Sequence, residues 1–195
     1  MRQLSSYIMN FLLNNIKLKK LYNLNGILIS TVVFIIFMVF VLPWVSNMME
    51  GFGNVQSPDT LFTYSSEKLF SITHDYGVEG RRMYLIQRFT FDLFWPIVYG
   101  MFCLSLIGFA VMRFERLMKY KYLVYVPVIA VIMDYVENIL VSVVFLMYPA
   151  ESRMIAILAS VSTSIKWIYV SLSMILAVVS ILYILTTIIQ KKKVH

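Results

Sequence analysis

Four long apolar stretches dominate the pattern of hydrophobic and polar positions along the chain. A helix needs about 20 mostly apolar residues to cross the hydrocarbon core of a membrane, and all four stretches approach or exceed that length. They lie at residues 27–45, 92–112, 122–147 and 154–189. The pattern therefore predicts an all-α polytopic protein with four transmembrane helices, folded as a single four-helix membrane domain over residues 1–195.

The fourth stretch is longer than one crossing requires. As a continuous helix it would extend about 54 Å at 1.5 Å per residue. Lys166 interrupts its apolar character. We predict that residues 167–189 cross the membrane, with Lys166 near the outer boundary. Residues 154–165 would then form a more polar extension on the outer side.

Lys and Arg residues are concentrated in three short segments beside these stretches, at residues 1–25, 113–121 and 190–195. Cytoplasmic segments of membrane proteins carry an excess of Lys and Arg. Both termini are therefore predicted to be cytoplasmic, an N-in and C-in topology. The outer loops would be residues 46–91, which are predicted to be partly helical, and residues 148–153.

The composition supports a membrane location and excludes several functions. The chain has 60% hydrophobic and 14% charged residues, whereas about a quarter of residues are charged in soluble domains. The lipid bilayer of a cell membrane is thus the expected partner. The net charge of +7 belongs to the short basic segments, so we expect no nucleic-acid binding. The single Cys103 excludes an intramolecular disulfide, and we predict no metal site and no cofactor.

A stripe of polar residues leads from the first outer loop into the second apolar stretch. The residues recur at helical spacing, which predicts one side of one helix: Arg81, Tyr84, Arg88, Asp92 and Tyr99. Pro96 removes the helical hydrogen bond to the Asp92 carbonyl, so this position is a candidate polar or ligand-lined spot. The alternative is an ordinary ion pair between Arg88 and Asp92 at the membrane surface.

Three polar residues interrupt the third apolar stretch. Asp134, Glu137 and Asn138 have i, i+3, i+4 spacing and share one helix face. Counted inward from residue 121, they lie about 20–24 Å along a helix that crosses a core of about 30 Å. A charged group near the centre of a span costs about 2.5–3.5 kcal/mol, so the acids need a proton, water or a basic partner. The candidate partners are Arg81, Arg88 and Lys166.

Three functions are compatible with such a cluster. The first is binding or translocating a small ligand, a cation or a proton. The second is an intramembrane enzyme acting on a lipid or isoprenoid, with Asp134 or Glu137 as general acid or base and Asn138 as the orienting group. The third is a structural or accessory role, in which the polar groups join the helices. The candidate binding residues are Asp134, Glu137, Asn138, Asp92, Tyr99, Arg81, Arg88 and Lys166. No residue is assigned as catalytic.

The same residues carry a resemblance to a group of proteins. The sequence contains the pattern YG-x-EGR-x-x-Y, then D-x-x-x-P-x-x-Y, then P-x(6)-D-x-x-EN, over residues 76–138. In this it resembles a group of uncharacterised bacterial four-span integral membrane proteins. The resemblance implies a four-helix architecture and a polar site, and it implies no activity.

Overall fold

The computed structural model describes residues 19–50 and 55–193. Within these ranges the regular structure is entirely helical. Four helical segments are long and apolar enough to cross a membrane: Leu24–Met49, Gly77–Arg113, Glu115–Met147 and Arg153–Gln190. The predicted all-α, four-helix polytopic fold is thereby confirmed. Most of the predicted N-terminal basic segment, residues 1–18, lies outside the described residues.

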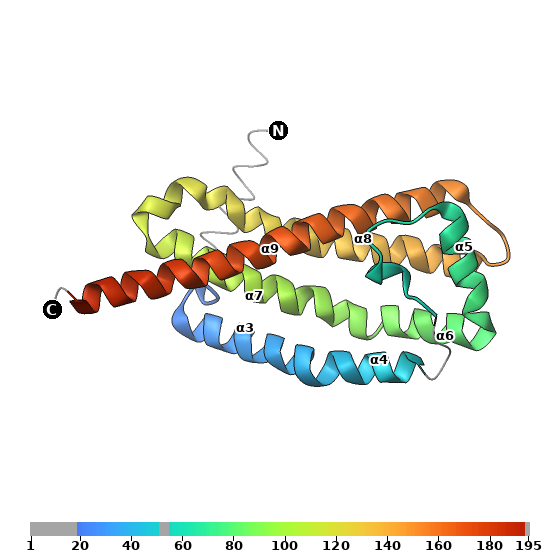
Figure 1. Cartoon of the computed structure of the whole chain (residues 1–195), viewed down its shortest axis with the longest axis horizontal. Helices are drawn as coiled ribbons and strands as arrows, with labels where there is room; N and C mark the ends of the chain where they lie inside the picture. The colour runs from blue at the N-terminus through green and yellow to red at the C-terminus, as the bar shows by residue number, and fades with distance from the viewer. Residues whose placement is uncertain (1–18, 51–54, 194–195) are drawn as a thin grey trace.

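The first crossing lies along one side of the bundle (Figure 1). It consists of α3 (Leu24–Ile36), a π-helical turn η1 (Phe37–Val41) and α4 (Leu42–Glu50). The Asn23 side chain caps α3 by accepting a hydrogen bond from the Gly26 amide at 2.8 Å. Most apolar side chains of this first crossing are exposed, and in a membrane they would face lipid.

The second crossing is interrupted. Helix α6 (Gly77–Arg88) and helix α7 (Phe91–Arg113) are separated at Phe89 and Thr90, which leave helical geometry. The Thr90 hydroxyl donates to the Ile86 carbonyl at 2.7 Å, an alternative to the backbone ladder. The prediction that the polar stripe belongs to one continuous helix is therefore wrong at this point.

Helix α7 continues through the proline inside it. The Tyr135 hydroxyl donates to the Leu93 carbonyl at 2.6 Å. Pro96 was predicted to leave the carbonyl of Asp92 without its helical hydrogen bond, and the carbonyl that Tyr135 contacts is that of the next residue, Leu93. A neighbouring helix thus supplies a donor to the backbone in the turn before the proline, as a helix in hydrocarbon requires.

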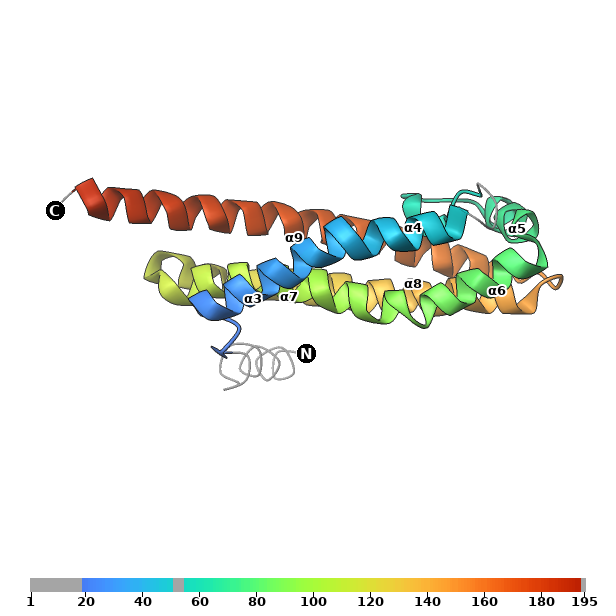
Figure 2. The same cartoon turned by 90° about the horizontal axis from the view of Figure 1, so that it is seen from below.

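Helices α8 (Tyr125–Met147) and α9 (Arg153–Lys193) pack along each other, and both contact α7. Helix α9 has 41 residues, which corresponds to about 62 Å, and its C-terminal end extends past the other helices in both views (Figures 1 and 2). It passes through Lys166 without a break, so the predicted outer extension continues the transmembrane helix.

The two ends of the bundle differ in composition. The connection η3 (Glu115–Val124) and the C-terminal end of α9 lie at one end (Figure 1). This end carries Arg113 and the basic residues of η3, and we call it the basic end. Helix α5 (Ser66–Asp75) and the short helix η2 (Pro58–Thr60) lie toward the opposite end. The N-in and C-in orientation stays a prediction.

Two apolar cores fill the bundle. The core toward the basic end includes Cys103, Ile107 and Val124. The other core lies toward the opposite end, which we call the loop end, and includes Leu69, Tyr84 and Phe145. Along α7, α8 and α9, the chain passes from one core to the other through buried polar residues. A polar layer therefore separates two apolar layers.

Candidate functional site

The polar layer consists of side chains from four helices and one loop. Its core members are nearly inaccessible: Glu137 is 1% exposed, Arg88 4% and Lys166 5%. We call this layer the carboxyl cluster and define it by four acids and two bases: Asp59, Asp92, Asp134, Glu137, Arg88 and Lys166. Helices α6, α7, α8 and α9 contribute five of them, and the segment around η2 contributes Asp59.

Arg88 binds two carboxyl groups from different parts of the chain. One terminal nitrogen lies 2.8 Å from Asp59 and the other lies 2.7 Å from Asp92. The second nitrogen also donates to the Asn138 side-chain oxygen at 3.1 Å. The flat guanidinium lies over the Tyr84 ring, with its carbon 4.5 Å from the ring centre. Arginine suits this position because its planar fork can reach several acceptors at once.

Lys166 on α9 pairs with Glu137 on α8. The other Glu137 oxygen lies 2.8 Å from the Thr163 hydroxyl, and the Tyr64 hydroxyl lies 3.0 Å from that same Thr163 oxygen. A carboxylate only accepts, so Thr163 donates its single proton to Glu137, and Tyr64 in turn donates to Thr163. A buried chain of donors thus runs from the loop to the acid.

Asn138 connects Arg88 to Asp134. Its oxygen accepts from Arg88, and its amide nitrogen donates to Asp134 at 3.3 Å. The second Asp134 oxygen accepts from the Tyr99 hydroxyl at 3.0 Å. Asp134 is therefore held by two neutral donors, while the other three acids each contact a basic side chain.

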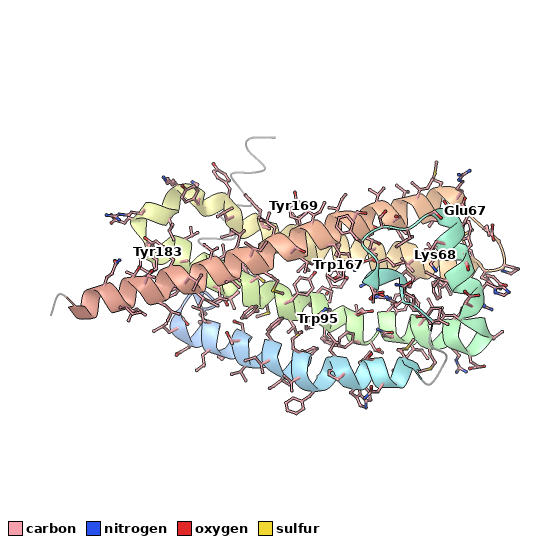
Figure 3. The ribbon with its side chains drawn as sticks, in the orientation of Figure 1. Glu67, Lys68, Trp95, Trp167, Tyr169 and Tyr183 are labelled. Carbon is pink, nitrogen blue, oxygen red and sulfur yellow. The ribbon has the colours of Figure 1, made fainter. Side chains whose placement is uncertain are left out.

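The segment containing η2 covers the cluster at the loop end. The Trp167 indole donates to the Asp59 carbonyl at 3.0 Å, and Trp167 lies beside this segment in Figure 3. The Tyr64 amide donates to the Ser160 hydroxyl at 3.0 Å, and the Ser164 hydroxyl donates to the Phe62 carbonyl at 2.9 Å. These bonds use side chains of α9 to satisfy loop backbone, so the loop is fixed against the helix.

Charge is not balanced within the cluster. Four acids contact or surround only two bases, so fully ionised groups would leave two negative charges uncompensated. Ionised carboxylates without partners are costly in a buried, low-dielectric site. The arrangement is therefore suited to taking up positive charge.

Asp59 lies outside the membrane-spanning segments, and its pKa is shifted. Burial acts to raise the pKa of its carboxyl. The charges of Arg88 and Lys166, with hydrogen bonds from Arg88 and Ser57, outweigh burial and lower that pKa below the usual range for aspartate. Asp59 is thus an ionised partner of Arg88 at neutral pH.

Replacing Asp59 by Asn should destabilise the protein in a pH-dependent way. A carboxyl whose folded pKa is depressed stabilises the fold fully above its unfolded pKa of about 3.9 and loses that contribution as the pH falls further. The difference in free energy of unfolding between the native chain and Asp59→Asn should thus be constant from neutral pH to about pH 5 and shrink in more acidic solution. Denaturant titrations in detergent measure it. Asp75→Asn, at an exposed acid, is the control, and a pH-independent difference for Asp59→Asn would contradict the prediction.

The structure brings together seven of the eight residues predicted from the sequence: Asp92, Asp134, Glu137, Asn138, Tyr99, Arg88 and Lys166. The eighth, Arg81, makes its contacts elsewhere. Its guanidinium donates to the Thr73 carbonyl at 3.2 Å and lies 4.0 Å over the Tyr148 ring. It belongs to the packing between α5, α6 and the end of α8.

Sequence reasoning missed three contributors. Asp59 and Tyr64 come from a loop whose position no periodicity predicts. Thr163 precedes Lys166 by three residues on the same helix, so the two share a face. Thr163 could therefore have been predicted from its spacing to Lys166, whereas the positions of Asp59 and Tyr64 could be known only from the three-dimensional structure.

Within residues 19–50 and 55–193, no group of three or more His, Cys, Asp or Glu side chains is close enough together to hold a metal ion. Comparison of the chain with models of known protein families, with curated proteins and with solved structures finds no match.

Proposed function

We propose that this membrane protein binds protons at its carboxyl cluster and acts as a proton-coupled carrier or sensor in the cell membrane. The observation that carries the proposal is the excess of carboxyl groups over basic groups: the buried Asp92, Asp134 and Glu137 face only Arg88 and Lys166, and the partly exposed Asp59 adds a fourth acid. Ionisable residues at membrane depth mark proton and ion pathways in many transporters. Protonation is the simplest way to neutralise the excess.

The separation of the carboxyl groups favours a proton over a metal ion. Asp59 and Asp92 are directed at Arg88, whereas Glu137 is directed at Lys166 and Thr163. A metal ion needs several oxygen ligands around one point. A proton needs one carboxyl oxygen and a neighbouring acceptor, which this arrangement offers.

Asp134 is the proposed proton-binding group. Among the described residues it is the one cluster acid without an ion pair. Its partner Tyr99 can either donate or accept through the hydroxyl. Asp134 can therefore keep a hydrogen bond to Tyr99 whether its carboxyl group is protonated or ionised.

Infrared difference spectroscopy tests the proposal on the full chain in lipid nanodiscs. Lowering the pH within the range in which exposed carboxyl groups stay ionised, above about pH 6, should increase a band from a protonated carboxyl group, and Asp134→Asn should remove this change. Asp75→Asn, at an exposed acid outside the cluster, should leave the change intact. A spectrum without such a change in this range, or a change that persists in Asp134→Asn, would refute Asp134 as the proton-binding group.

A structural role is the second candidate, and one observation favours it. The cluster links α6, α7, α8, α9 and the loop segment through hydrogen bonds and ion pairs. Such networks fix how membrane helices pack. Two measurements distinguish the functions. If the cluster is purely structural, the native chain takes up no proton, and Asp134→Asn lowers the free energy of unfolding.

A further inference from the structure

A pocket of about 670 Å³ lies at the basic end of the bundle. It is formed by the start of α3, the end of α7 and the C-terminal part of α9, so it is separate from the carboxyl cluster. Its volume is within the range of about 300–1,000 Å³ found for small-molecule sites.

Two glycines fix the frame of this pocket. A side chain at Gly108 on α7 would collide with the ring of Tyr22, which lines the pocket. A side chain at Gly26 would collide with the carbonyl oxygens of Lys20 and Leu21. The turn before α3 therefore packs closely against α3 and α7, and this packing forms one wall of the pocket.

The lining of the pocket has a polar and an apolar part. Asn23, Asn25 and Arg113 line it together with the first residues of α3. The Asn23 side chain accepts from the Gly26 amide in the first turn of α3, and the N-terminus of the helix favours negative charge beside it. The apolar part includes Ile188 on α9 and Leu24, which are 50% and 69% exposed and so open toward lipid.

The charge at this end determines the class of ligand. Arg113 lines the pocket, and the described segments at this end also carry Lys19, Lys20, Arg116, Lys119 and Lys121, with Glu115 as the acid among them. Basic pockets between membrane helices on the cytoplasmic side recognise anionic lipid head groups. Arginine is especially suited to phosphate because it can donate two parallel hydrogen bonds.

We propose that this pocket binds an anionic phospholipid of the cytoplasmic leaflet, with Arg113 and the N-terminus of α3 facing the phosphate. A phospholipid fits better than a free phosphate, because the apolar part of the pocket is continuous with the lipid-facing side of α3 and α9. An acyl chain can follow that surface while the head group stays beside Arg113.

The test is native mass spectrometry of the full chain released from nanodiscs of phosphatidylglycerol and phosphatidylcholine in equal amounts. The native protein should retain phosphatidylglycerol preferentially. Arg113→Gln should reduce the retained anionic lipid about fivefold, which corresponds to about 1 kcal/mol for one basic residue at an anionic surface. Arg116→Gln, which removes a charge outside the pocket lining, is the matched control.

A second variant separates the pocket from general charge attraction. Thr187→Phe adds volume inside the pocket without changing any charge, so it should also reduce retention of phosphatidylglycerol. Equal losses in Arg113→Gln and Arg116→Gln, with none in Thr187→Phe, would overturn the proposal in favour of diffuse attraction. Displacement of the lipid by millimolar inorganic phosphate would overturn the choice of a lipid over a soluble anion.

Discussion

Replacing Lys166 by Met is expected to lower the free energy of unfolding by about 3–5 kcal/mol, the usual cost of leaving one member of a buried ion pair without its partner. The size follows from the position of Glu137, which is 1% exposed and cannot recover hydration. Thr163 would still donate to it, but one neutral hydrogen bond does not replace the charge of an ammonium group. Chemical denaturation of the purified chain in mild detergent measures the loss.

The double variant Lys166→Met with Glu137→Leu is the decisive comparison. Replacing a whole buried pair by apolar groups is often neutral or stabilising, unlike removal of one partner. The double variant should therefore recover most of the stability that Lys166→Met loses, since Thr163 can donate to the Ala159 carbonyl, 2.9 Å away. Lys68→Met, at an exposed lysine, should change stability by less than about 0.5 kcal/mol. Equal losses in the single and double variants would show that the pair is not coupled.

Replacing Arg88 by Gln is expected to cause a loss of similar size, about 3–5 kcal/mol. This change removes the basic partner of both Asp59 and Asp92, so two acids lose their compensation. It also removes the donor to Asn138. Denaturation in the same detergent measures the change, and limited proteolysis near η2 should become faster because Asp59 no longer fixes the loop.

Two control variants identify the cause of that loss. Arg88→Lys keeps the charge but cannot bridge two carboxyl groups with a planar fork, so it should recover only part of the stability. Arg82→Gln removes an exposed charge from the same helix and should remain within about 0.5 kcal/mol of the native chain. An Arg82→Gln loss as large as that of Arg88→Gln would contradict a specific role for Arg88.

The polar residues inside apolar stretches were predictable as a site. Asp134, Glu137 and Asn138 share a face because three and four residues separate them on a helix. Their depth in the membrane excluded lipid contact, because an isolated charge in hydrocarbon is too costly. Because of the same cost, Arg88 and Lys166 were expected beside these residues, as the structure shows, but the pairing of each base with each acid was not predicted.

Arg81 was assigned to the cluster wrongly. Helical spacing grouped it with Arg88 and Asp92, and Arg81 and Arg88 do share helix α6. Seven residues separate them, however, which is about 10 Å along the helix, and the Arg81 side chain contacts Thr73 and Tyr148. Periodicity identifies residues on one face of a helix, but it does not show which of them lie at the depth of the cluster.

The sequence by itself determined the number of crossings, the helix class and the polar face of the third crossing, because these follow from the lengths of apolar runs and the period of one helix. Only the tertiary structure decided that Asp59 enters the cluster and that Tyr64 extends it through Thr163. Both residues belong to a loop whose path depends on hydrogen bonds from α9. Contacts between segments about 100 residues apart arise from packing of the whole bundle, which no local pattern encodes.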